Sequence, residues 1–232
     1  MNAERVKEVF SKVSTNSIMN VQKVPANNIE KIRKSGLPKF IQQLIALAGL
    51  VAFSPILLLT ALLIRLESPG DAIFTQTRVG LKGRRFKIYK FRSMRMMTDP
   101  KYVDISQLKA DREGVCAKLF KDPRITLIGR FIRKSSIDEL PQLINVLKGD
   151  MLLIGPRPAL PKETDIYTKK AFGRLSSIPG LTGLWQVSGR ADTTFDEQVE
   201  LDLRYARQRS LIEDIRILWM TVPAVIFGKG AY

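Results

Sequence analysis

The sequence contains no histidine and only one cysteine, Cys116. Without histidine, the chain cannot supply an imidazole base for a catalytic triad or imidazole ligands for a metal. A single cysteine excludes an intrachain disulfide and a zinc site of several thiolates, and Cys116 is better explained as a small apolar side chain than as a nucleophile. Carboxylates, hydroxyls, lysines and arginines remain. An enzyme built from these groups that acts on an anion would use a hard divalent cation held by oxygen ligands.

Acidic residues are scarce relative to basic ones. The chain has 22 Asp and Glu against 38 Lys and Arg, which gives its 232 residues a formal net charge of +16. This excess predicts attraction to anions, but it does not choose between nucleic acid, acidic lipid head groups and phosphorylated substrates. The first forty residues also lack the apolar core of a secretory signal peptide, so no cleaved leader is expected.

One long apolar run, from Phe40 to Ile64, interrupts this charged sequence. At about 1.5 Å per residue, it is long enough to cross a bilayer core of about 30 Å as a helix. Ser54-Pro55 lies near its middle, and proline kinks or breaks a helix because it lacks a backbone donor. Basic residues, which prefer the cytoplasmic side, flank the run at both ends. These flanks favour a re-entrant helix that breaks at Ser54-Pro55 and returns, and a proline-kinked spanning helix is the alternative.

A β-hairpin is predicted after the apolar run. Residues 72–79 and 85–91 are both β-prone, and the glycine-containing segment 80–83 between them is typical of a hairpin loop. Along the second of these strands and just after it, aromatic residues are interleaved with Lys87, Lys90, Arg92 and Arg95. This pattern fits a platform for single-stranded nucleic acid or an exposed basic face, opposite an apolar face, near lipid head groups, and the alternation favours the second interpretation.

Helices are predicted in the second half of the chain. Apolar residues recur at helical spacing over residues 138–148. A further helix is expected over residues 195–209, where Thr194 and Glu197 have the spacing of a capping box. The apolar stretch 215–227 is too short to span a bilayer and fits an interfacial or core helix.

The adjacent carboxylates Asp138 and Glu139 are the strongest candidates for chemistry. Pro141 is tolerated only in the first turn of a helix, so both should lie at a helix N-terminus, where backbone N–H groups stabilise negative charge. A helix cap explains the pair when it is taken alone. Several cations precede it: Arg124, Arg130, Arg133 and Lys134. With these cations and a membrane segment nearby, the pair also fits a phosphoryl-transfer site, in which an aspartate can act as the nucleophile.

Other residues could help to bind an anion. Arg157 stands between two prolines, which hold the backbone extended and lower the entropy lost when the side chain grips a ligand. Ser188-Gly189-Arg190 offers backbone N–H groups and an arginine, which is a weak signal. Each of these also fits a solvent-exposed turn, and Asp202 by itself fits the solvated face of a helix.

In their order along the chain, these motifs resemble those of the bacterial sugar transferases, the monotopic phosphoglycosyl transferases. The resemblance covers residues 38–227 and is carried by the following segments: Ser54-Pro55, 74–76, 86–94, 122–126, 136–142, 149–151, 154–158, 179–183 and 188–190. Each motif alone is modest evidence, whereas the ordered set is specific.

The resemblance implies a reaction and a set of site residues. A sugar 1-phosphate passes from a UDP-sugar to a polyprenyl phosphate such as undecaprenyl phosphate, UMP is released, and a surface glycan is begun. It implies that Asp138 forms a covalent phosphosugar intermediate, that Glu139 binds Mg²⁺ and that Arg133 binds phosphate. We extend a role in binding phosphate or uridine to Lys90, Arg157 and Arg190. We extend a role in the site to Asp202.

The expected fold is α+β: mostly helical, with a small β-hairpin, in a monotopic membrane protein of the short catalytic-core form. We expect a polar extension over residues 1–36, a re-entrant helix-break-helix over residues 37–66, and a catalytic domain with interfacial helices over residues 67–232. The resemblance implies the cytoplasmic face of the bacterial inner membrane and no nucleic-acid partner, and it leaves a homo-oligomer open. The rival hypothesis is a membrane-tethered basic adaptor without catalytic activity, which binds nucleic acid or acidic lipid but leaves the paired carboxylates unexplained.

Overall fold

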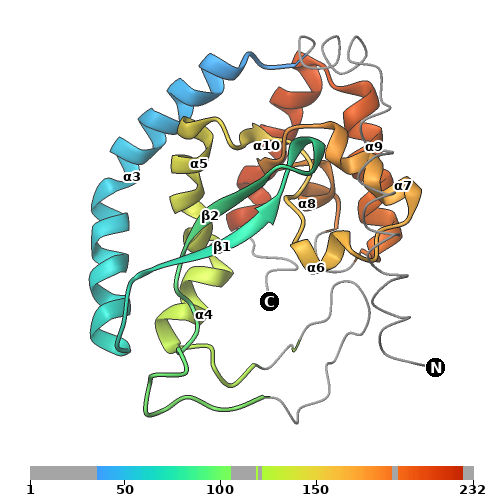
Figure 1. The fold of residues 1–232 in the computed structure, drawn as a ribbon. Coiled ribbons are helices and arrows are strands. Elements are labelled where there is room, and N and C mark those ends of the chain that lie inside the picture. The colour runs from blue at the N-terminus through green and yellow to red at the C-terminus, as the bar shows by residue number, and fades with distance from the viewer. Residues whose placement is uncertain (1–35, 106–118, 120–121, 190–192, 227–232) are drawn as a thin grey trace, which may run out of the picture.

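A computed structural model describes residues 36–105, 119, 122–189 and 193–226. The fold is α+β, as predicted, with one long helix along an edge of a mostly helical domain and a β-hairpin across its face (Figure 1). The elements in chain order are α3 (Lys39–Glu67), β1 (Ile73–Val79), η1 (Leu81–Gly83), β2 (Arg85–Phe91), α4 (Leu127–Lys134), η2 (Ile137–Gln142), α5 (Leu143–Lys148), β3 (Leu152–Ile154), α6 (Pro161–Thr164), α7 (Lys169–Phe172), η3 (Gly173–Ser176), β4 (Gly180–Thr182), α8 (Leu184–Ser188), α9 (Phe195–Gln208) and α10 (Leu211–Ile226).

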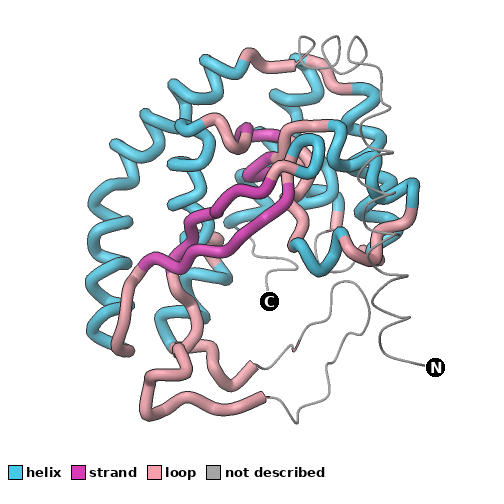
Figure 2. The backbone as a smooth tube through the Cα atoms, viewed as in Figure 1, coloured by secondary structure: helices cyan, strands magenta, loops and turns pink. Residues whose placement is uncertain are grey.

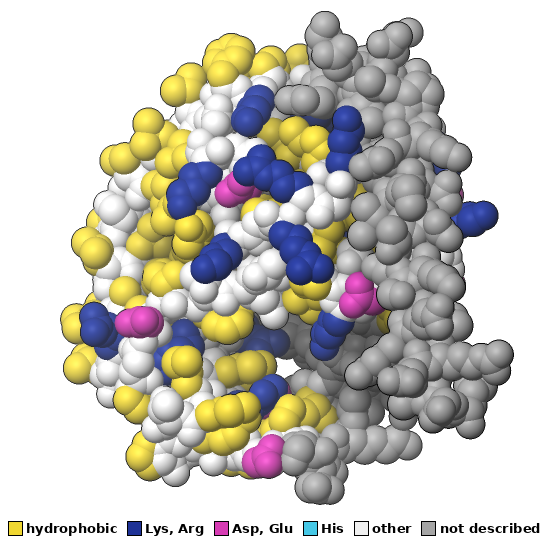
Figure 3. Space-filling model, viewed as in Figure 1, with side chains coloured by type: hydrophobic (Ala, Val, Ile, Leu, Met, Phe, Trp, Pro, Cys, Tyr) yellow, Lys and Arg dark blue, Asp and Glu magenta, His cyan; other side chains and the backbone are white. Residues whose placement is uncertain are grey.

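Helix α3 contains the long apolar run and is long and apolar enough to cross a membrane. Only 11% of its most apolar 18-residue window is buried, so its apolar side chains face outward. They gather along the edge of the molecule that α3 forms (Figure 3). A core helix of a soluble protein would be mostly buried, so this exposure favours contact with lipid.

The predicted break at Ser54-Pro55 is not an interruption, because α3 runs as one helix through Pro55. Its axis changes direction partway along its length (Figure 1). Pro55 has no N–H to donate to the carbonyl of Val51, four residues earlier. The Ser54 hydroxyl donates to that carbonyl instead, at 2.8 Å. The side chain beside the proline therefore replaces the missing backbone donor, and the helix continues.

The predicted hairpin is confirmed. Strands β1 and β2 pair antiparallel, with Ile73 opposite Phe91 and Val79 opposite Arg85 (Figure 2). A second, short sheet was not predicted: β3 and β4 pair in parallel, with Leu152 opposite Gly180. The main hydrophobic core lies where these strands meet the helices. Its buried side chains are Ala46, Ile88, Leu143, Val146, Met151, Leu153, Ile154, Tyr205 and Ile217.

The helix predicted over residues 138–148 divides into the 3₁₀ helix η2 and the α-helix α5. Helix α9 has the predicted capping box, in which the Thr194 hydroxyl accepts from the Glu197 amide. Helix α10 begins at Leu211, earlier than its apolar pattern indicates. The acidic residues Glu213 and Asp214 in its first turn suit the positive end of the helix dipole.

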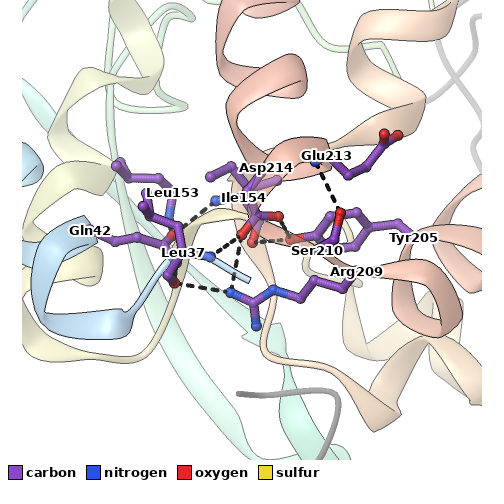
Figure 4. A network of polar contacts seen from close by, with 9 residues as sticks. All are labelled: Leu37, Gln42, Leu153, Ile154, Tyr205, Arg209, Ser210, Glu213 and Asp214. Atoms are coloured by element: carbon purple, nitrogen blue, oxygen red, sulfur yellow. Dashed lines mark hydrogen bonds and ion pairs between the residues drawn. The ribbon is translucent and has the colours of Figure 1, made fainter. Parts of the chain in front are cut away.

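A buried polar network fixes the start of α3 against α9 and α10 (Figure 4). Fully buried Asp214 accepts hydrogen bonds from the Leu37 amide at 2.7 Å and from the Tyr205 hydroxyl at 2.6 Å. The Arg209 guanidinium lies 3.4 Å from the same carboxylate. Gln42 donates to the Leu37 carbonyl at 2.7 Å and accepts from the amide of Leu153 in β3. The entry to the apolar helix is therefore held by the folded domain.

The domain also holds the end of α3. Glu67 accepts from the backbone amides of Leu127 and Ile128, at 2.6 and 2.9 Å, and so caps α4. Arg92, which follows β2, donates to the Ser68 and Asp71 carbonyls. Arg92 is buried, so the expectation of an exposed basic face along β2 is wrong at this position. Its guanidinium is used to satisfy the carbonyls that follow α3.

Candidate active site

A left-handed residue presents the paired carboxylates. Ser136 has φ 56° and ψ 16°, which is uncommon for a residue other than glycine and turns the chain sharply between α4 and η2. The Glu139 amide donates to the Ser136 carbonyl at 3.2 Å. Asp138 and Glu139 consequently lie in the first turn of η2, as predicted, although this turn is 3₁₀ rather than α-helical. Strained backbone of this kind is often found at functional sites.

Strand β2 supplies a cation to the pair. Lys90 Nζ lies 2.6 Å from Glu139 Oε1. The buried Asn145 side chain of α5 holds the strand in place, because it accepts from the Tyr89 amide at 3.1 Å and donates to the Lys87 carbonyl at 2.7 Å. Sequence reasoning placed Lys90 in the site but missed Asn145. The only signal for Asn145 in the sequence was its position on the buried side of a predicted helix.

The two adjacent carboxylates differ in their electrostatic surroundings. Burial and the neighbouring charge of Glu139 raise the pKa of Asp138 to about 7, against the opposing effect of Lys90 and Arg133. Burial also disfavours the charged form of Glu139, but the cations Lys90, Arg157 and Arg78 outweigh it and lower the pKa of Glu139. Environments that separate the pKa values of two neighbouring carboxylates in this way are typical of catalytic acids, bases and nucleophiles. Near neutral pH, Glu139 is ionised while Asp138 titrates.

Arg157 approaches the pair from the loop that follows β3. Its guanidinium lies 3.7 Å from a carboxylate oxygen of the buried Glu163, and its charge acts on Glu139. The loop is packed tightly against β4, since the Gly180 amide donates to the Pro156 carbonyl at 2.9 Å and a Cβ on Gly155 would lie 2.5 Å from the Ile178 carbonyl oxygen. The rigid presentation expected from the two prolines is therefore reinforced by contacts with a neighbouring strand.

Asp202 does not lie on a solvated helix face, so that interpretation of the sequence is wrong. It is 1% exposed and forms an ion pair with Arg174 at 2.6 Å. Burial raises the pKa of Asp202 to about 6, although Arg174 and the backbone amide of Arg157 oppose the shift. The structure thus places Asp202 against the backbone of Arg157 and in an ion pair with Arg174. Arg190, the remaining predicted cation, lies outside the described residues.

The acidic pair fits Mg²⁺ but not a cage made wholly of protein ligands. Within the part of the chain that the structure describes, no group of three or more His, Cys, Asp or Glu side chains could hold a metal. The side chain of Glu139 is 41% exposed, and its Oε1 is the oxygen that contacts Lys90. Mg²⁺ is commonly held by one or two carboxylates together with substrate phosphates and water. Glu139 with Asp138 meets that requirement.

Comparison with known proteins gives a consistent result. The model of the bacterial sugar transferase family matches residues 34–228. Over 169 residues the chain is 52% identical to the galactosyl transferase CpsE of Streptococcus agalactiae, covering 70% of this chain and 36% of that protein. It is 38% identical over 192 residues to the exopolysaccharide production protein ExoY of Rhizobium meliloti, covering 82% and 85% respectively.

A third relative is named for its reaction. The chain is 42% identical over 207 residues to a UDP-glucose:undecaprenyl-phosphate glucose-1-phosphate transferase of Caulobacter vibrioides, covering 84% of this chain and 72% of that protein. The match to CpsE spans only about a third of that protein's length, whereas the match to ExoY spans most of it. The matched region includes the paired carboxylates, Lys90, Arg157 and Asp202.

Proposed function

The chain belongs to the bacterial sugar transferase family, and on this premise we propose that it is a phosphoglycosyl transferase that moves a sugar 1-phosphate from a UDP-sugar to undecaprenyl phosphate. The names of relatives support this, since they include an undecaprenyl-phosphate galactose phosphotransferase and two glucose-1-phosphate transferases. The observation that carries the proposal is the pair Asp138 and Glu139, in which Lys90 contacts Glu139 at 2.6 Å and the pKa values of the two carboxylates shift in opposite directions.

The proposed chemistry has two displacements at phosphorus. An ionised oxygen of Asp138 attacks the β-phosphorus of the UDP-sugar, the bond from this phosphorus to the bridging oxygen breaks, and UMP leaves with that oxygen. An oxygen of the lipid phosphate then attacks the same phosphorus, displaces the Asp138 carboxylate and forms a diphosphate link to the lipid. Lys90, Arg133 and Arg157 orient and neutralise the phosphate oxygens. Mg²⁺ bound at Glu139 would supply further positive charge to the phosphates.

The covalent step can be tested directly. The detergent-extracted protein is incubated with Mg²⁺ and UDP-galactose or UDP-glucose that carries a radioactive β-phosphate. We expect label on the wild-type protein and on an Asp196→Asn control, whose carboxylate is exposed in the first turn of α9. Asp138→Asn should remain unlabelled. Covalent label that persists in Asp138→Asn would refute the assignment of the nucleophile.

The rival hypothesis of a basic adaptor predicts a different result. No UDP-sugar in a panel would release UMP, and polynucleotide binding would weaken steeply with salt. The paired carboxylates and the braced Arg157 oppose this hypothesis, because binding to nucleic acid requires neither. The same panel of UDP-sugars would identify the sugar that is transferred.

We also propose that α3 is re-entrant and that both of its ends face the cytoplasm. The main support is that both ends are bound to one domain, through Leu37 and Asp214 at the start and through Glu67 and the α4 amides at the end. A spanning helix would place these partners on opposite sides of the bilayer. Exposed apolar side chains on α4 and α10, including Phe131 and Trp219 at 65% and 80%, fit helices that lie in the membrane interface.

This topology is open to cysteine labelling. With Cys116 replaced by alanine, single cysteines at Lys34 and Lys82 should both react with a membrane-impermeant reagent in inverted inner-membrane vesicles. Neither should react in intact spheroplasts. Reaction of the two positions from opposite sides would establish a spanning helix.

A further inference from the structure

Arg78, in β1, is a buried cation that has entered so far only through its charge, which helps to lower the pKa of Glu139. Its side chain is 6% exposed. It donates to Gln76 Oε1 at 2.7 Å and to the Pro158 carbonyl at 3.2 Å. Its Nε has no hydrogen-bond partner among the described residues, and within the same part of the chain no carboxylate lies close enough to form an ion pair with it. Burial of a charge without an ion-pair partner costs folding free energy, so the presence of an arginine at this position calls for an explanation.

The hairpin places Arg78 on the same face as Lys90. Arg78 pairs with Phe86 across the hairpin, and Phe74 pairs with Lys90. Because alternate residues and cross-strand partners share a face, Arg78 and Lys90 project to the same side at different points along the hairpin. Lys90 reaches Glu139, whereas Arg78 reaches the loop that carries Arg157.

The contact with that loop is part of a larger attachment. Pro158, whose carbonyl accepts from Arg78, follows Arg157 directly. The next residue, Ala159, exchanges two backbone hydrogen bonds with Val79, at 2.8 and 3.2 Å. The hairpin therefore holds the loop by its backbone just after Arg157. The Arg78 side chain adds one contact to this attachment, at the carbonyl of the residue that follows Arg157.

The charge of Arg78 is only partly balanced. Burial, with the nearby Arg157, lowers the pKa of Arg78 to about 10, against the attraction of Glu163 and Glu139. Arg78 thus stays protonated at neutral pH. Arg157 itself is 3.7 Å from its carboxylate neighbour, Glu163. Arg78 and Arg157 therefore share one region, in which Glu163 pairs with Arg157 and, among the described residues, no carboxylate pairs with Arg78. A ligand rich in negative charge would complete the balance.

We propose that Arg78 is a positioning residue for the transfer reaction, which holds Arg157 through the Pro158 carbonyl and whose buried positive charge favours binding of the diphosphate of the nucleotide-sugar donor. This inference rests on the proposed function. It differs from a purely structural role because it requires Arg78 to act through Arg157 and on donor affinity.

A double-mutant cycle tests the proposal. Arg78→Gln should raise KM for the UDP-sugar and weaken UDP binding, measured by calorimetry, by about tenfold, with a smaller effect on kcat. Arg78→Lys retains the charge and should recover part of the UDP affinity. In an Arg157→Gln background, Arg78→Gln should cause little further loss, because residues that act through one another are not additive. In an Arg133→Gln background, the two losses should add.

Arg84→Gln provides a matched control on the same hairpin, since that side chain is 79% exposed. It should leave UDP affinity unchanged. The proposal is overturned if Arg78→Gln lowers Tm but leaves UDP affinity and KM intact, or if its effects add fully to those of Arg157→Gln. Should Arg78→Gln fail to fold, Arg78→Lys takes its place in the cycle, and a loss of UDP affinity that adds fully to that of Arg157→Gln would overturn the proposal. A wild-type protein that binds UDP but releases no UMP would refute the proposed function, and the UDP affinities would still decide the role of Arg78.

Discussion

Asp138 and Glu139 are neighbours in sequence, yet their surroundings give them different charge states. The sequence made the pair the leading candidate and correctly placed it at the start of a helix, because Pro141 limits where that helix can begin. It could not reveal the difference between them. That difference depends on Lys90, which lies 49 positions earlier and reaches Glu139 only through the register of a hairpin.

The pH dependence of transfer should report the ionisation of Asp138. Only the carboxylate form can attack phosphorus, and the pKa of Asp138 is about 7. We therefore expect kcat/KM to rise about tenfold per pH unit below pH 7 and to level off above it. Lys90→Met removes a cation that lowers the pKa of Asp138. The rise in kcat/KM should therefore occur at higher pH in this variant. A flat profile between pH 5.5 and 7 would contradict the assignment.

The same ionisation should lower the stability of the folded protein at alkaline pH. The pKa of Asp138 rises from 3.8 to about 7 on folding, so the native state binds the extra proton between these values and stability falls as pH rises through them. We expect Asp138→Asn to have a higher Tm than the wild type at pH 8 and a similar Tm at pH 4. The exposed Asp196→Asn should show no such pH-dependent difference. An equal difference in Tm between Asp138→Asn and the wild type at both pH values would exclude a link between stability and the ionisation of Asp138.

Among the elements, α3 shows most clearly that a single side chain can change what general sequence rules predict. Its length and apolar character were predictable, and so was a disturbance at Pro55. Its continuity was not, because general rules for proline do not include the hydroxyl of Ser54, which donates to the Val51 carbonyl. The hairpin and α9 followed from local patterns. The pairing of β3 with β4 joins strands of three residues each, too short to leave a periodic signal.

Ser54 should be more important for stability than an exposed serine elsewhere in a helix. Ser54→Ala leaves the Val51 carbonyl without a donor in apolar surroundings, where an unsatisfied polar group costs about 1–3 kcal/mol. We expect a lower Tm in lipid nanodiscs. Ser54→Thr keeps the hydroxyl and should remain close to the wild type. An unchanged Tm in Ser54→Ala would show that the hydroxyl is dispensable.

At the scale of the whole molecule, long-range polar contacts unite the apolar helix with the catalytic domain. The bond from the Leu37 amide to Asp214 joins residues 177 positions apart. No local pattern predicts such a contact, because it depends on how α3, α9 and α10 pack together (Figure 4). The sequence could therefore indicate a membrane segment and a domain, but not their attachment.

Asp214→Asn should loosen this attachment. It removes the charged partner of the buried Arg209, and breaking a buried pair from one side costs about 3–5 kcal/mol. We expect a loss of this order in unfolding free energy and faster hydrogen exchange at the Leu37 amide. Glu213→Gln is the matched control, because the contact of Glu213 with Arg216 is 3.8 Å long and its partner side chain is 63% exposed. Equal effects of the two substitutions would contradict a special role for Asp214.

The distance in sequence between Leu37 and Asp214 also orders events during synthesis. A ribosome adds roughly 5–20 residues per second, so the 177 positions between the two residues correspond to roughly 10–35 s of translation. Throughout that interval the apolar helix exists without the carboxylate that later binds the residue just before it, Leu37. The partners of Glu67 at the other end of the helix are only 60 and 61 positions away and are made much earlier. The end of α3 can therefore dock on the domain well before its start does.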